Sequence, residues 1–130
     1  MSGQVQLMFS NFTAALPHIK SGKLRALAVT CEQRTPSAPS LPTVIESGLP
    51  GYSVTSWYGL LTPARTPQPI IAKLNSEVVK VLKQPGIGDR LAADGAEPAS
   101  DTPAEFEALI KSELAKWQKV IKKAGLADSL

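Results

Sequence analysis

The chain has 130 residues, with 14 basic and 11 acidic side chains, a formal net charge of +3, 11 prolines and one cysteine. This length suits one compact domain or two small lobes, and it excludes a large multidomain enzyme. The single Cys31 excludes an intramolecular disulfide and a multi-cysteine metal site. The charge is mild and no arginine-rich run occurs, so we expect no nucleic-acid partner.

No targeting or membrane segment is evident in the sequence. No apolar stretch approaches the roughly 20 residues needed to cross a bilayer. The first residues, Met1 to Gln6, lack the basic region followed by an apolar one that marks a signal peptide. Expressed as written, the chain is therefore expected to stay in the cytoplasm.

The first part of the chain predicts a compact βαβ unit. Val5–Phe9 is a short apolar run that predicts a strand, and Leu24–Thr30 predicts a second one. Between them, Phe12–Lys20 predicts a short helix made irregular by Pro17. A strand, helix and strand in so few residues favour parallel pairing with a right-handed crossover.

A proline-punctuated loop is predicted next, over residues 31–42. Pro42–Gly48 predicts one short helix that ends on a glycine, and Pro50 with Gly51 predicts a turn. Tyr52–Leu61 is rich in β-branched and aromatic residues, which predicts a third strand.

The remainder is predicted to be mostly helical. A long helix is expected from Pro67 to about Lys83, and a short one over Ile87–Asp94. Ala96–Ala99 is a candidate edge strand. Thr102 to Glu105 has the pattern of a capping box, which predicts a last helix to Ala124.

No catalytic constellation emerges from the sequence, so we expect no enzyme, no cofactor and no metal site. His18 is the only histidine, and no carboxylate lies near it in sequence. We interpret it as a surface or partly packed side chain, and Cys31 as a small packed residue. The carboxylates Glu105, Glu107 and Glu113 lie on a helix whose other face is apolar, which indicates a solvated face.

Two features remain as candidate ligand sites. Ser10 and Asn11 lie where a predicted strand runs into a helix N-terminus, a place where parallel α/β folds bind anions. On physical grounds alone, N-capping of the helix is favoured over ligand binding as the role of these residues. Trp57 and Tyr58 alternate along the third predicted strand, so one of them faces away from the core. That side chain could form the wall of a pocket, or it could pack between two lobes, and the sequence does not distinguish these roles.

The sequence also resembles a known family along most of its length. The matching words are Gly3–Asn11, Ala15–Thr30, Leu41–Val44, Gly48–Tyr52, Ser56–Leu61 with Pro63-Ala64, Thr66-Pro67, Leu74-Asn75, Gly95–Pro98 and Lys116-Trp117. They resemble the substrate-binding receptors of tripartite tricarboxylate transporters, also called the Bug family. The resemblance is to the C-terminal portion of such receptors.

The resemblance implies a periplasmic receptor that closes on a small carboxylate solute and delivers it to membrane permease subunits. It implies an α/β fold of type II periplasmic-binding-protein kind, with three-layer lobes, of which the N-terminal lobe strands are missing here. Residues 1–51 would end the second lobe, and residues 52–130 would supply a crossover strand and helices of the first lobe. Ser10 and Asn11 would face the ligand cleft, with Trp57 and Tyr58 near the crossing.

Two hypotheses follow for the chain by itself. In the first it is a truncated receptor, unable to bind its solute tightly alone because a cleft with one wall leaves the carboxylate half solvated. In the alternative it is a non-transport interaction module that self-associates as a homodimer or by domain swapping through exposed sheet edges.

Overall fold

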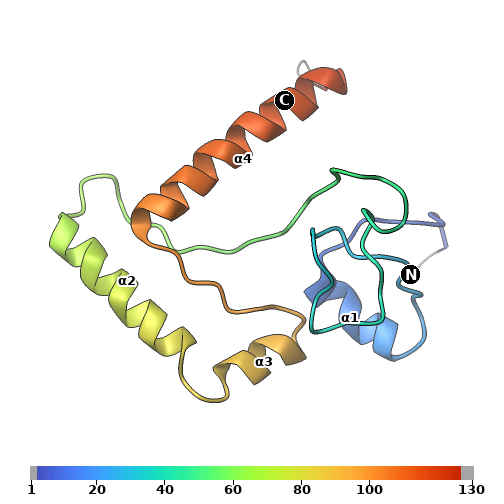
Figure 1. The fold of residues 1–130 in the computed structure, drawn as a ribbon, viewed down its shortest axis with the longest axis horizontal. Helices are drawn as coiled ribbons and strands as arrows, with labels where there is room; N and C mark the ends of the chain where they lie inside the picture. Colours follow the sequence, from blue (N-terminus) through green and yellow to red (C-terminus); the bar gives the residue numbers. More distant parts are fainter. Residues whose placement is uncertain (1–2, 127–130) are drawn as a thin grey trace. The chain divides into compact units, whose positions relative to one another are not determined.

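The computed structural model describes residues 3–126. Within that range it contains four helices, which are α1 Phe12–Lys20, α2 Gln68–Leu82, α3 Ile87–Ala93 and α4 Pro103–Lys123 (Figure 1). All four were predicted from the sequence, and their ends lie close to the expected positions. None of the helices in this range is long and apolar enough to span a bilayer.

The helix ends are set by local signals. At α1, the side chain of Asn11 accepts a hydrogen bond from the backbone N–H of Thr13. At α4, the predicted capping box is confirmed, because Thr102 and Glu105 bond each other's backbone reciprocally and proline takes the first helical position. After α3, Gly95 adopts a positive φ of 76°, the left-handed conformation that ends helices at low cost.

The individual strand predictions are wrong for the described residues. Residues 3–126 contain no strand, and the four segments predicted as strands are extended or irregular chain, namely Val5–Phe9, Leu24–Thr30, Tyr52–Leu61 and Ala96–Ala99. A strand exists only as part of a hydrogen-bonded ladder, so β-propensity cannot create one without a neighbour. In the first of these segments Leu7 is 62% exposed and Phe9 is 72% exposed.

One short point of β-like pairing remains. Val29 forms an isolated parallel bridge with Thr43, in which the N–H of Val29 donates to Pro42 O at 2.9 Å. At the next residue, Thr30, the backbone oxygen accepts a hydrogen bond from the N–H of Val54 at 2.9 Å. The second and third predicted strands therefore touch, but no predicted βαβ sheet forms among the described residues.

The helix predicted over Pro42–Gly48 is a single turn. Ser47 N–H donates to Thr43 O at 3.1 Å, which is one helical step, and the chain then turns away. Gly48 has a φ of 106°, and Pro50 follows it. A left-handed residue and a proline directly after this turn prevent the helix from extending.

The chain divides into two compact units. Unit 1 is Met1–Leu61 with Lys83–Pro98, and it contains α1 and α3. Its buried side chains among the described residues are Leu16, Val29 and Thr43. Gly95 packs closely here: a β-carbon at this position would lie 2.7 Å from Cδ1 of Phe12. The packing of unit 1 thus brings Gly95, two residues after the end of α3, against the first turn of α1.

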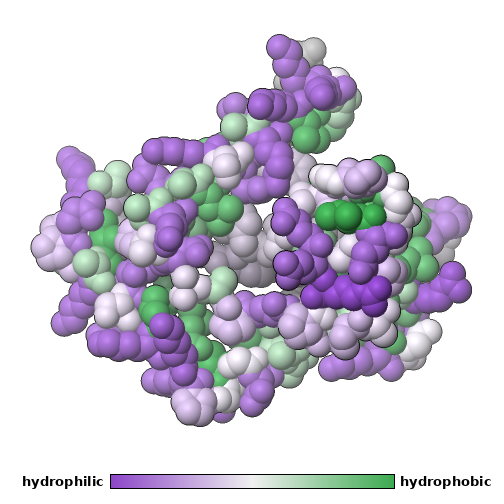
Figure 2. Space-filling view, in the orientation of Figure 1, coloured by the Kyte–Doolittle hydropathy of each residue, from purple (hydrophilic) through white to green (hydrophobic). Residues whose placement is uncertain are grey.

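Unit 2 is Thr62–Leu82 with Ala99–Leu130, and its described helices are α2 and α4. Asn75 of α2 donates from Nδ2 to Asp101 O at 2.9 Å, just before α4 begins. No residue of either helix is buried, and the side chains of Leu114 and Ile70 are 59% and 51% exposed. In Figure 2, apolar side chains appear in green among hydrophilic ones on the surface that is drawn.

Candidate functional site

The candidate site of unit 1 is built on the start of α1. The side-chain oxygen of Asn11 accepts two hydrogen bonds from Thr13, one from its backbone N–H at 3.2 Å and one from its hydroxyl at 2.8 Å. These donors fix the orientation of the Asn11 amide, because the oxygen must face Thr13. The amide nitrogen therefore points away from the helix.

That nitrogen donates to the hydroxyl oxygen of Tyr58 at 2.6 Å, across 47 positions of sequence. The phenolic oxygen is the acceptor in this bond, so its own O–H proton is available as a donor. Within residues 3–126 that hydroxyl donates to no other group, and the Tyr58 side chain is 78% exposed. Two of the residues singled out by sequence, Asn11 and Tyr58, thus form one polar pair that presents hydrogen-bond donors to solvent.

The other two candidate residues contribute less to this pair. Ser10 is exposed, and its hydroxyl lies 3.4 Å from Asn11 O, which is a long and weak contact. Trp57 is 42% exposed and precedes Tyr58 in an extended segment. Among the four candidates, Asn11 and Tyr58 are the two joined by a described hydrogen bond between side chains.

The start of α1 adds favourable electrostatics to this pair. The N-terminus of a helix carries a partial positive charge and backbone N–H groups, which favour anions. The first turn of α1 contains no acidic residue that would already use this charge. The arrangement can therefore donate hydrogen bonds to a carboxylate.

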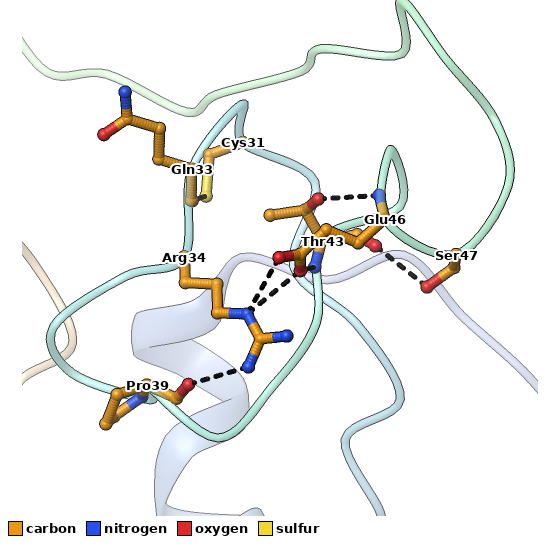
Figure 3. A network of polar contacts seen from close by, with 7 residues as sticks. All are labelled: Cys31, Gln33, Arg34, Pro39, Thr43, Glu46 and Ser47. Atoms are coloured by element: carbon orange, nitrogen blue, oxygen red, sulfur yellow. Dashed lines mark hydrogen bonds and ion pairs between the residues drawn. The ribbon is translucent and has the colours of Figure 1, made fainter.

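A second polar group lies in the loop that the sequence predicted to be irregular (Figure 3). The Nε of Arg34 donates to both carboxylate oxygens of Glu46, at 3.1 and 3.0 Å, and one Nη donates to Pro39 O at 3.2 Å. The buried Thr43 completes the network, because its backbone N–H donates to Glu46 at 2.7 Å. This network closes the loop on itself.

The charge of Glu46 is stabilised inside this network. The hydrogen bond from the Thr43 N–H, and then the bond and charge of Arg34, lower the pKa of the Glu46 carboxyl below its usual value. Partial desolvation opposes this shift without reversing it. Glu46 therefore stays ionised and paired, which makes it a structural group and leaves the Arg34 charge largely neutralised.

The remaining chemically versatile side chains stay apart. His18 is exposed near the end of α1, and the thiol of Cys31 donates to Gln33 O at 2.9 Å. In the described part of the chain, no group of three or more His, Cys, Asp or Glu side chains could hold a metal ion.

Sequence reasoning missed two of these contacts. The Asn11–Tyr58 pair could not be read from spacing, because it joins residues far apart in the chain. The Glu46 network had a local signal, since Thr43 and Glu46 have the threonine-x-x-glutamate spacing of a capping box. That signal correctly describes the reciprocal bonds between the two residues, although no helix follows them.

Comparison with known proteins places this geometry in a family. Residues 1–126 match the model of the tripartite tricarboxylate transporter family receptor. Protein BugT of Bordetella pertussis is 33% identical over 125 residues, covering 96% of this chain and 38% of BugT.

Three solved structures are also similar. The R. palustris protein Rpa4515, solved with adipate, is 37% identical with a TM-score of 0.85, covering 95% of this chain and 41% of that one. The periplasmic binding protein BugD is 36% identical with a TM-score of 0.75, covering 86% of this chain and 38% of that one. MatC of Rhodopseudomonas palustris, solved with malate, is 35% identical with a TM-score of 0.73, covering 85% and 38%.

These matches bear out the predicted fold class. The structural neighbours are periplasmic binding proteins, and this chain corresponds to part of their fold. The chain spans about two fifths of the length of BugT, Rpa4515 and BugD. The family is one of substrate-binding receptors rather than enzymes. The chain belongs to the tripartite tricarboxylate transporter receptor family.

Proposed function

We propose that this chain is part of a periplasmic solute receptor that binds a small carboxylate and delivers it to the membrane permease of a tripartite tricarboxylate transporter. In this role it has no catalytic activity. The observation that carries the proposal is the Asn11–Tyr58 pair at the start of α1, which offers hydrogen-bond donors where the first turn of the helix has no acidic residue. Structures of two family relatives with adipate and malate support a carboxylate as the ligand class.

The donor role falls mainly on Tyr58 in this proposal. Its oxygen already accepts from Asn11, so its proton is directed toward a ligand oxygen. A carboxylate accepts such a bond more strongly than a neutral carbonyl does. Ser10 and Trp57 would line the same region, with the indole as an apolar wall for the carbon chain of the solute.

A chimeric receptor tests this role. The matched part of the adipate-bound R. palustris protein is replaced by residues 3–126 of this chain, and calorimetry measures binding of adipate, malate and succinate. We expect at least one of these dicarboxylates to bind, and the variant Tyr58→Phe to bind it about fivefold more weakly, the effect of one lost hydrogen bond.

The matched control is Tyr52→Phe, which removes the other tyrosine hydroxyl in the chain. Tyr52 contacts Phe9 through its ring, with centroids 6.5 Å apart, so this variant keeps its packing. Equal affinities for the Tyr52→Phe and Tyr58→Phe chimeras would remove the proposed donor. A folded chimera that binds none of the three dicarboxylates would remove the proposed ligand class.

The 130-residue chain alone is proposed to bind such a solute only weakly. The hydrogen bond of the Asn11–Tyr58 pair lies at an exposed position, and Tyr58 is 78% exposed. Hydrogen bonds and charges in contact with water contribute far less to affinity than those in a closed cleft. Calorimetry of the chain alone checks this, and micromolar binding of a dicarboxylate would contradict it.

Self-association is the second candidate function, and exposed apolar chain favours it. Leu7 and Phe9 in one extended segment, and Leu60 and Leu61 in another, are each more than half exposed. Unpaired extended apolar segments are templates for pairing with a second copy, as a homodimer or by domain swapping. Light scattering during size-exclusion chromatography distinguishes the candidates, because a monomer that unfolds cooperatively would exclude association.

A further inference from the structure

We infer that Gly95 is a positioning residue for the Asn11–Tyr58 pair, acting through the ring of Phe12. This inference rests on the proposed function for its consequence on ligand binding, and on the structure alone for the contact. The four residues concerned all lie in unit 1, and they come from three separate parts of the sequence. The absence of a side chain at position 95 lets the Phe12 ring lie close to it.

The contact at Gly95 is closer than any side chain would allow. A β-carbon there would lie 2.7 Å from Cδ1 and 3.2 Å from Cε1 of Phe12, and 3.4 Å from Cδ2 of Leu16. Leu16 is one of the buried side chains of unit 1, so it cannot retreat into solvent without losing buried apolar contact. The ring of Phe12 is therefore the group that a larger residue would displace.

Phe12 lies directly beside the donor pair in the chain. It is the first residue of α1, and Asn11 is the N-cap that precedes it. We expect a shift of the Phe12 ring to move the first turn of α1 and with it the Asn11 amide. The bond from that amide to Tyr58 is 2.6 Å long, and a displacement of about 1 Å takes a hydrogen bond out of its useful range.

The segment after Gly95 is held from a second direction. The hydroxyl of Thr35 donates to Oε1 of Glu97 at 2.5 Å, which ties this segment to the loop over residues 31–42. This bond restrains the segment that follows residue 95. We therefore expect a side chain at position 95 to displace Phe12, on the side of the Asn11–Tyr58 pair.

Fluorine NMR on the whole chain tests the inference without a ligand. The chain has two tyrosines, Tyr52 and Tyr58, so 3-fluorotyrosine gives two signals that Tyr52→Phe assigns. Asn11→Ala provides the reference shift for Tyr58 without its amide partner. We expect Gly95→Ala to move the Tyr58 signal toward that reference while circular dichroism retains the helical signal.

The matched control is Gly86→Ala. Gly86 has a φ of 80°, close to the 76° of Gly95, but a β-carbon there would meet nothing within 4 Å. It reproduces the backbone strain of Gly95→Ala without the contact to Phe12. We expect the Tyr58 signal of Gly86→Ala to stay at the wild-type position. An equal displacement of that signal in both variants would assign the effect to backbone strain and overturn the inference.

A second variant covers the case in which Gly95→Ala does not fold. Phe12→Leu changes the other partner of the same contact: it replaces the ring with a smaller side chain and keeps an apolar residue in the helix. It is expected to displace the Tyr58 signal by itself, and a signal at the wild-type position would overturn the inference. In the double variant Gly95→Ala with Phe12→Leu, the smaller side chain is expected to restore folding where the single variant lost it.

Binding by the chimeric receptor separates this inference from the proposed function. If both hold, Gly95→Ala weakens dicarboxylate binding about fivefold, as Tyr58→Phe does, whereas Gly86→Ala does not. A displaced Tyr58 signal in a chimera that binds no dicarboxylate would keep the positioning role and remove the proposed function. An unchanged signal in a chimera that binds dicarboxylates would do the reverse.

Discussion

Each of the two compact units is stabilised internally by a different kind of contact. In unit 1, hydrogen bonds join residues that are far apart in sequence, such as Asn11 with Tyr58 and Thr35 with Glu97. In unit 2, many of the side-chain bonds span one helical turn, as in Lys80 with Glu77 on α2. Unit 1 therefore depends on its tertiary arrangement, whereas unit 2 depends more on helix signals that are local in sequence.

Burial follows the same division. The buried side chains in residues 3–126 all belong to unit 1, where Thr43 is only 1% exposed. Both helices of unit 2 carry apolar side chains along one face, yet none of these is buried. The candidate ligand residues also lie in unit 1, where packing of Phe12 and Leu16 supports the start of α1. A defined polar site therefore needs packed side chains that support it, and helix formation alone does not supply them.

The largest expected effect comes from removing part of that support. Leu16→Ala should reduce the free energy of unfolding of unit 1 by about 3 kcal/mol, because it deletes a buried side chain and leaves a cavity. Each unit has one tryptophan, so fluorescence during urea unfolding reports on unit 1 through Trp57 in a Trp117→Phe background.

The matched change in unit 2 is Leu114→Ala, read through Trp117 in a Trp57→Phe background. Leu114 is 59% exposed, and its loss should change stability by no more than about 0.5 kcal/mol. A loss at Leu114 as large as the loss at Leu16 would contradict the proposed difference between the two units.

An intermediate effect is expected at the start of α4, where unit 2 has its clearest local signal. Thr102→Ala removes the hydroxyl that accepts the backbone N–H of Glu105 at 3.2 Å. The helix should lose about 1 kcal/mol of stability, as other N-caps do. Circular dichroism during urea unfolding, with Trp117 fluorescence, measures it. Thr102→Ser keeps the hydroxyl and should restore most of the loss, so an equal loss in both variants would exclude the capping explanation.

The same division explains how much of the fold could be predicted from sequence. The four helices were predictable because their signals are local. Asn11 caps α1, Thr102 and Glu105 form the capping box of α4, and Gly95 follows α3. The strands were not, because a segment such as Val5–Phe9 becomes a strand only when a neighbour completes its hydrogen bonds. Family resemblance supplied the fold class that these segments could not establish by themselves.

The candidate site was predictable only as a set of separate residues. Ser10 and Asn11 could be proposed from their place before a helix, and Trp57 and Tyr58 from their size and alternation. The bond between Asn11 and Tyr58, and the support of Phe12 by Gly95, depend on chain packing over many residues. Periodicity and spacing contain no information of that kind, so the physical site emerges only from the structure.

The smallest expected effect is the pH dependence of the loop network in unit 1. The Thr43 N–H and then Arg34 lower the pKa of Glu46 in the folded chain below its usual value. A carboxyl with a lowered folded-state pKa contributes stability above its unfolded pKa, and this contribution is lost as the pH falls through the folded value. Acidification should therefore weaken unit 1 in a window that starts near the ordinary glutamate pKa and extends below it. Trp57 fluorescence in urea, repeated at several pH values, measures this loss.

Substitution identifies the carboxyl responsible. Glu46→Gln removes the charge that Arg34 pairs with, so unit 1 should be weaker at neutral pH and lose less stability on acidification. The matched control is Glu32→Gln, an exposed neighbour that forms no ion pair among the described residues, and it should keep the wild-type dependence.

Unit 2, read through Trp117, should keep its own acid loss in both variants, because bonds from Lys111 and Lys116 lower the pKa values of Glu107 and Glu113. If Glu46→Gln and Glu32→Gln showed the same profile at Trp57, the loop network would contribute nothing to the stability of unit 1. The contrast with unit 2 would then rest on buried apolar contacts alone.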